Sequence, residues 1–361
     1  MLLASLVVTA GSTFAQIALD GNRPVFGVDD KTFISAPDEG LWSVATGWEN
    51  DWMCDWKHAD PQSVEKIGEW TVLSGKMSFD SGDLILRDSY RQIREGLVQC
   101  VRRYEWTGTE TLPDVTLSVR WKMAGESMMP CLPGILYYGN RNGAKVNPEI
   151  IPVYEGCDGE FAIFEEHRYP MPFAMLENAA EGTAAAIHSV PSPVRGAVLA
   201  DQWWSMGVVA KDGSGELVLY SGPIGYNGRH SVAKALQKKP MRYADTWIDL
   251  EPGRIIEKTF YIETYPIEGE GTGFQTPVYT SMDLHRPYDA DRFPSFDEIV
   301  RGKYNFAKNR WIDLGNGAVG FNMYDSSTLW QIHGDADPTC QFYANMLQCH
   351  HINWVFGEME I

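Results

Sequence analysis

Basic residues are scarce in this sequence. Its 361 residues include 30 lysines and arginines against 48 aspartates and glutamates, which gives a formal net charge of -18, and the isoelectric point is near 4.8. Nucleic-acid backbones and anionic membranes attract proteins through basic surface patches. The charge balance therefore argues against a nucleic-acid or membrane-surface partner.

Motifs of several catalytic and metal-binding classes are also missing. The six cysteines contain no CxxC pair, which argues against a zinc ribbon or a thioredoxin-like site, and buried free thiols are expected. The sequence has no HExxH, GxSxG or Walker motif. Two Asp-Ala-Asp segments, at residues 289–291 and 335–337, lack the glycine and distal glutamate of a calcium loop. We expect neither a metal ion nor a cofactor.

Long hydrophobic runs are absent as well. The first 16 residues form an apolar stretch that ends in small residues at Thr13 and Ala15, as a signal peptide does. It is too short to span a membrane. It lacks the usual basic start, which leaves a mis-assigned gene start or lost first residues as alternatives. We expect residues 1–15 to be a signal peptide and the protein to be secreted or periplasmic.

What the sequence does contain is a succession of strand-length apolar runs separated by turn residues. The pattern is clearest at residues 184–190, 203–210 and 217–221, and residues 211–215 between the last two runs predict a hairpin turn. No repeat of fixed length appears, which argues against a propeller or a solenoid. Residues 25–70 show no clean period and are interpreted as loops around short strands. We expect a large antiparallel β-sandwich over residues 16–284.

The pattern changes at Pro294. Ser295 and Glu298 form a capping box, and apolar residues at helical spacing then predict a helix to about residue 309. A second helix could begin at residues 337–338. Residues 285–294 are the predicted linker. Glycines 269, 271 and 273 resemble part of a phosphate-binding loop, but no helix is expected after them, so a flexible loop is favoured.

The segments SMDLHRPYDADRFPSFDEIV and KYNFAKNRW, placed after a β-sandwich of this size, resemble the N-terminal part of the six-hairpin glycosidases. The resemblance implies a β-supersandwich of the galactose-mutarotase type followed by an (α/α)6 toroid that carries the catalytic carboxylates. A toroid needs roughly two hundred residues. Residues 295–361 are therefore expected to be the start of a truncated helical domain, and the rest of that C-terminal domain to be missing.

Sugar contact is one role for the 13 tryptophans and 16 tyrosines, and core packing is another. Trp42, Trp48, Trp52 and Trp56 could form an aromatic rim for a glycan, although packing under a long loop is favoured. Three further groups are candidates for substrate binding, because they are predicted at a strand end, beside paired aromatics, or at a groove between domains. They are Glu165, Glu166, His167 and Arg168; Asp201, Trp203 and Trp204; and Asp283, His285 and Arg286.

Two functions follow from these expectations. The first is the front portion of an exported glycoside hydrolase that acts on a complex polysaccharide, with acidic sugars as an open alternative. Such a fragment is expected to be inactive without its toroid, and the catalytic residues are not assigned. The second is a non-catalytic carbohydrate-binding or structural β-sandwich. Carbohydrate is the expected partner in the first case and in the binding form of the second.

Overall fold

The computed structural model describes residues 17–28, 31–49, 52–125, 128–134, 160–194, 203–211, 213–222, 247–285, 294–308, 311–313, 319–322 and 331–333. The chain divides into two compact units, Met1–Arg286 and Pro287–Ile361. The proposed signal peptide, most of the proposed linker, Asp201, Arg286 and the possible second helix lie outside the described residues.

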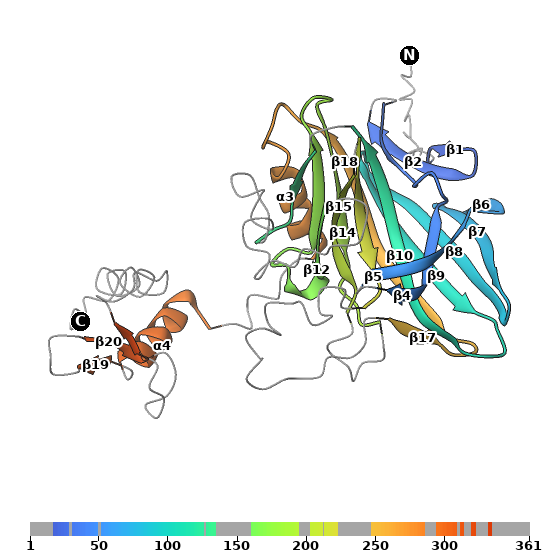
Figure 1. Ribbon diagram of the computed structural model, residues 1–361. Helices are drawn as coiled ribbons and strands as arrows, with labels where there is room; N and C mark the ends of the chain where they lie inside the picture. The colour runs from blue at the N-terminus through green and yellow to red at the C-terminus, as the bar shows by residue number, and fades with distance from the viewer. Residues whose placement is uncertain are drawn as a thin grey trace, which may run out of the picture. The chain divides into compact units, whose positions relative to one another are not determined.

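The first unit is a β-sandwich of two antiparallel sheets, as the sequence predicts (Figure 1). Ten of the described strands form the first sheet, with β4 and β17 pairing onto β10 beside the main path β1-β2-β3-β10-β16-β15-β12. Its strands are β1 (Leu19–Asp20), β2 (Arg23–Val28), β3 (Lys31–Ser35), β4 (Trp42–Glu49), β5 (Trp52–Ala59), β10 (Leu112–Ala124), β12 (Glu160–Glu165), β15 (Ser205–Lys211), β16 (Ser214–Tyr220) and β17 (Ile248–Leu250).

The second sheet contains eight of the described strands in the order β11-β13-β14-β18-β9-β8-β7-β6. These are β6 (Ser63–Ile67), β7 (Trp70–Phe79), β8 (Gly82–Arg94), β9 (Leu97–Trp106), β11 (Met129–Cys131), β13 (Phe173–Asn178), β14 (Thr183–Ser189) and β18 (Ile255–Pro266). Residues 25–70, predicted as loops around short strands, do contain short strands, β2 to β6, which occupy more of the segment than expected. Their extent was underestimated because their side chains do not alternate cleanly between apolar and polar.

The core lies between the two sheets. On β9 every second residue from Val98 to Trp106 is buried, because side chains of a strand point alternately to opposite faces. Arg102, also on β9, is fully buried and pairs with Asp88 through two hydrogen bonds of 2.8 and 2.7 Å. Its third contact, 3.0 Å to the carbonyl oxygen of Ser118, reaches β10 in the opposite sheet. A buried charge is tolerable there because Nε, Nη1 and Nη2 of the guanidinium each donate to a partner.

The hairpin predicted at residues 211–215 is present. β15 and β16 pair up to Lys211 and Ser214, and Gly213 in the turn has a φ of 71°, which glycine adopts without steric cost. This turn fixes the register of the two strands, and therefore which of their side chains face outward.

One helix of the first unit was not predicted. The unit contains a short 3-10 helix, η1 (Glu166–Arg168). The unpredicted helix is α3 (Gln275–Leu284), which directly follows the glycine-rich segment and contacts β13 and β14 (Figure 1). The expectation that no helix follows the glycines was wrong. The reason is that α3 buries Pro277, Thr280 and Ser281 while exposing Tyr279 and Met282, so it lacks the usual apolar stripe.

The second unit contains α4 (Phe296–Lys308) and a three-stranded sheet of β19 (Trp311–Asp313), β20 (Val319–Asn322) and β21 (Gln331–His333). The capping box before α4 is formed: the Glu298 backbone N–H donates to Ser295 Oγ at 3.3 Å, and the Ser295 backbone N–H donates to the Glu298 carboxylate at 2.7 Å.

Candidate functional site: an aromatic cluster on the first sheet

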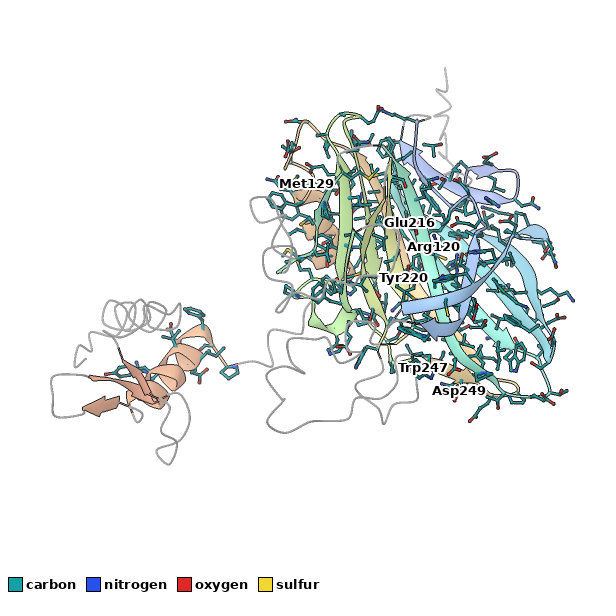
Figure 2. The ribbon with its side chains drawn as sticks, in the orientation of Figure 1. Arg120, Met129, Glu216, Tyr220, Trp247 and Asp249 are labelled. Carbon is teal, nitrogen blue, oxygen red and sulfur yellow. The ribbon has the colours of Figure 1, made fainter. Side chains whose placement is uncertain are left out.

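The outer face of the first sheet collects polar and aromatic side chains. On β10, Leu117, Val119 and Trp121 belong to the core, so Ser118 and Arg120 point to the other face. On the neighbouring strand β16, Leu217 and Leu219 face the core, whereas Glu216 and Tyr220 face outward. Figure 2 shows Arg120, Glu216 and Tyr220 along this part of the sheet, with Trp247 and Asp249 further toward β17.

The β4–β5 hairpin brings two tryptophans to the same face. The Trp56 ring lies 6.3 Å from that of Tyr220, and the Trp48 ring lies 5.7 Å from that of Trp247. Trp48 Nε1 donates to Thr116 Oγ1 at 3.0 Å, which orients its ring. Trp48, Trp56 and Trp247 are half-buried, and Tyr220 is buried beneath them. We call Trp48, Trp56, Tyr220 and Trp247 the aromatic cluster.

Charged and polar groups border the aromatic cluster. Arg120 donates two hydrogen bonds to Glu216, at 2.8 and 2.9 Å, and its guanidinium lies 5.7 Å from the Trp56 ring centre. Burial lowers the pKa of Arg120, but the hydrogen bonds to Glu216 and the electrostatic attraction of Tyr220, Glu216 and Glu39 together raise it more. Arg120 is therefore a fixed cation. The site places a guanidinium and a carboxylate next to aromatic ring faces.

His58 adds a neutral polar group at the edge of the cluster. Its ring is stacked against Trp56 at an interplanar angle of 14°, and its Nδ1 lies 2.9 Å from Ser43 Oγ. Burial and the nearby Arg120 lower the pKa of His58, although Glu39 acts in the opposite direction. The imidazole is thus uncharged at neutral pH and can donate or accept a hydrogen bond.

Glu165 lies in the same row of the sheet as Tyr220. The pairing runs from Glu165 to Ser205, from Ser205 to Tyr220 and from Tyr220 to Ser118. Glu216 is two strands and four residues away from Glu165, which separates their Cα atoms by about 16 Å. Glycosidase carboxyl pairs are about 5 to 9.5 Å apart. Glu165 and Glu216 therefore do not form such a pair.

The neighbouring candidate Glu166 points into the sandwich instead. It is fully buried and accepts hydrogen bonds from Ser189 Oγ, from Lys258 Nζ and, at 2.6 Å, from the Ser192 backbone N–H. Lys258 also lies 5.4 Å from the ring of buried Trp204. Burial raises the pKa of Glu166 and lowers that of Lys258. Glu166 and Trp204 are thus inside the protein, away from any ligand on the surface.

The remaining sequence candidates are dispersed. The ring of exposed His167 lies 5.2 Å from that of Trp203, which is half-buried. Asp283 is exposed on α3, and His285 follows that helix. The Arg168 side chain, Asp201 and Arg286 lie outside what the structure describes. Of the four tryptophans of the proposed rim, Trp42 is in the core and Trp48 and Trp56 are in the aromatic cluster.

Two polar clusters under α3 and its preceding loop were not anticipated. Glu263 receives hydrogen bonds from Arg94 at 2.7 Å, from Thr280 of α3 at 2.6 Å and lies 3.0 Å from His188 Nε2. The buried carboxylate of Glu177 accepts the backbone N–H groups of Gly271 and, at 2.9 Å, Gly273. The glycine segment therefore does bind an anion, one from its own chain.

Within the described residues, no helix is long and apolar enough to cross a membrane. The same part of the chain contains no group of three or more His, Cys, Asp and Glu side chains arranged for a metal ion.

No model of a known protein family matches this sequence, and no curated protein matches it. Solved structures with low similarity include a protein from Escherichia coli K12 called an aldose 1-epimerase, at 13% identity and a TM-score of 0.34, covering 70% of this chain and 82% of that one. An aldose epimerase homologue from C. elegans has 9% identity and a TM-score of 0.31 over 57% of this chain and 69% of its own. A heparan sulfate lyase from Pedobacter heparinus has 11% identity and a TM-score of 0.27 over 57% of this chain and 21% of its own. Similarities this low establish neither a family nor a function for this chain.

Proposed function

We propose that the β-sandwich unit binds carbohydrate at the aromatic cluster. The observation that carries this proposal is the combination of half-buried tryptophan rings with the fixed Arg120–Glu216 pair and the neutral His58. A sugar has apolar ring faces, which stack on aromatic rings, and hydroxyl groups, which need both donors and acceptors. The half-buried rings offer the first kind of contact and exposed His58 the second, while Arg120 and Glu216 are buried beside them.

Binding is favoured over hydrolysis at this face. Glycoside hydrolysis needs two carboxyl groups on either side of one bond, and Glu165 and Glu216 are about 16 Å apart by their strand positions. The carboxylate of Glu216 is in addition held by Arg120. The aromatic cluster is therefore proposed as a recognition surface.

A glycan array probed with the purified protein tests this proposal. We expect the wild type to retain a defined set of glycans and the variants Trp48→Ala and Trp247→Ala to lose them, because each removes one ring of a contacting pair. A wild-type protein that binds no glycan, or variants that bind the same glycans equally well, would contradict it.

A second candidate function is the front portion of an exported glycoside hydrolase acting on a complex polysaccharide. It is favoured by α4, which begins at the expected capping box and exposes Phe296 and Ile299 at 68% and 40%. In this proposal the catalytic carboxylates belong to a helical domain that follows the sandwich. The 361-residue chain is then expected to show no turnover on a polysaccharide panel. Hydrolysis that is lost on mutating Glu165 or Asp201 would refute it.

A further inference from the structure

A groove of about 490 Å³ crosses the outer face of the second sheet, on the opposite sheet from the aromatic cluster. β8 and β9 form its middle. Leu86 and Tyr104 of these strands face the core, so the alternate residues Ile85, Arg87 and Val101 face outward into the groove. Ile85 and Val101 supply an apolar floor, and Arg87 stands beside it.

The register of the sheet places two arginines directly opposite each other. Arg87 on β8 pairs with Arg103 on β9, and Arg103 in turn pairs with Glu257 on β18. Like charges at directly opposed positions destabilise a sheet. An arrangement of this kind needs negative charge nearby to offset the repulsion.

Arg103 has that compensation within the protein. Its guanidinium lies 3.1 Å from the Glu105 carboxylate and 3.2 Å from that of Glu257, and these hydrogen bonds raise the pKa of Arg103. Both acidic residues of the groove, Glu105 on β9 and Glu257 on β18, are thereby paired with Arg103.

Arg87 has no such compensation. It is exposed, and within the described residues it has neither a hydrogen-bond acceptor nor an acidic partner. Lys76, on the neighbouring strand, is by contrast held by Asp83 at 2.7 Å. The positions next to Arg87 are Ser74, opposite it on β7, and Ser89, on the same face of β8. A guanidinium beside two hydroxyl-bearing positions matches the hydrogen-bonding needs of a carboxylate, which arginine can bind through two parallel bonds.

We propose that this groove is a second saccharide subsite that binds an acidic sugar, with Arg87 holding the uronate carboxylate and the sugar ring lying over Ile85 and Val101. The proposal rests on the carbohydrate-binding function of the sandwich. It adds acidic sugars to the proposed ligands. The arginine at the aromatic cluster, Arg120, is already paired with Glu216, so it does not offer a carboxylate the same contact.

Calorimetric titration of galacturonic-acid oligosaccharides and neutral galactose oligosaccharides of equal length tests the subsite. We expect the wild type to bind the acidic oligosaccharide more tightly, and Arg87→Gln to weaken that binding by about 10- to 100-fold, since hydrogen bonds to charged groups contribute that much. Arg91→Gln is the matched control, because Arg91 lies on the same face of the same strand but already contacts Gln99 and Glu69. It is expected to bind like the wild type.

Three outcomes would overturn the subsite: no preference for the acidic oligosaccharide, equal binding by Arg87→Gln and the wild type, or an equal loss in both arginine variants. A sulfated oligosaccharide that binds more tightly through Arg87 than the uronate does would overturn the assignment to a carboxylate. Trp56→Ala separates the two proposals. If Trp56→Ala leaves neutral-sugar binding intact, the aromatic-cluster proposal fails. The subsite proposal is tested separately, by the binding of the acidic oligosaccharide to Arg87→Gln.

Discussion

The orientation of the Glu166 side chain determines its role: it points into the sandwich and forms a buried ion pair with Lys258. The two side chains are completely buried, and removing charges from water costs several kcal/mol per ion. The cost is offset because Ser189 Oγ and the Ser192 N–H donate to Glu166, while Lys258 also donates to the Val190 carbonyl oxygen at 2.9 Å. The arrangement ties β14, β18 and η1 together inside the sandwich.

Replacing Lys258 by methionine is expected to lower the free energy of unfolding by about 3 to 5 kcal/mol, because it leaves a carboxylate buried without a cation. The double variant Lys258→Met, Glu166→Leu should recover much of that loss. Urea denaturation followed by tryptophan fluorescence measures both. If Lys258→Met alone is as stable as the wild type, the buried carboxylate of Glu166 does not need the Lys258 cation.

The candidate site could be predicted only in part, for a reason visible at Glu165 and Glu166. The sequence indicates that a strand ends near these residues, but adjacent residues at a strand end point in different directions, and the choice between outside and inside depends on the opposing sheet. Trp42 and Trp48 illustrate the same limit. Both belong to one tryptophan-rich segment, yet Trp42 is in the core and Trp48 is in the aromatic cluster. Arg87 gives no local signal, since its role depends on Arg103 across the sheet.

At the scale of elements, α3 is held to the second sheet by polar contacts. Thr280 of α3 donates to Glu263, which also receives a hydrogen bond from Arg94. His285, at the C-terminal end of α3, and His188 each have one buried ring nitrogen without a hydrogen-bond partner among the described residues. Hydrophobic periodicity could not predict this helix, because the side that it buries is not apolar.

Acidification is expected to destabilise this helix. Burial, together with nearby His188, lowers the pKa of His285. Below about pH 6.5 an unfolded chain protonates this histidine while the folded chain resists it, so stability falls as pH falls. The pKa of Glu263 is also lowered: burial raises it, but hydrogen bonds from His188, Thr280 and Arg94 lower it more. The stability from Glu263 is therefore present above about pH 4.3 and is lost at lower pH.

Urea denaturation of the wild type and of His285→Gln between pH 8 and pH 5 measures the first effect. The variant should lose less stability over this range than the wild type, because it has one titrating group fewer. Asp283→Asn, which changes an exposed residue two positions earlier, should keep the wild-type slope. Identical slopes in all three proteins would mean that His285 is not held in its neutral form.

A further prediction concerns the glycine-rich segment before α3. Glu177→Gln removes the negative charge that the Gly271 and Gly273 N–H groups bind. Charged hydrogen bonds contribute about 1.5 to 3 kcal/mol, so amide hydrogen exchange in residues 269–273 should become faster. Glu181→Gln is the control, since Glu181 is exposed and pairs only with Lys31 among the described residues. Equal protection in both variants would exclude an anchoring role for Glu177.

At the scale of the whole molecule, the sandwich was the part most accessible from the sequence. Alternating apolar residues and glycine-containing turns are local features, and they indicated both the β class and the β15–β16 hairpin. The order of strands was not accessible, because pairs such as β18 with β9 join segments about 150 residues apart. That non-local order is what brings Trp48 next to Trp247, and so it creates the proposed carbohydrate surface.

The most direct test of that surface is a calorimetric titration of an array-selected neutral glycan into the wild type, Trp56→Ala and Trp70→Ala. Trp70 is also half-buried, but it lies on the second sheet beside Arg91. Aromatic stacking contributes about 1 to 3 kcal/mol per ring in comparable contacts with bases, so Trp56→Ala should bind about 5- to 150-fold more weakly. Trp70→Ala should bind like the wild type. Equal affinities for Trp56→Ala and the wild type, or an equal loss in both variants, would contradict carbohydrate binding at the aromatic cluster.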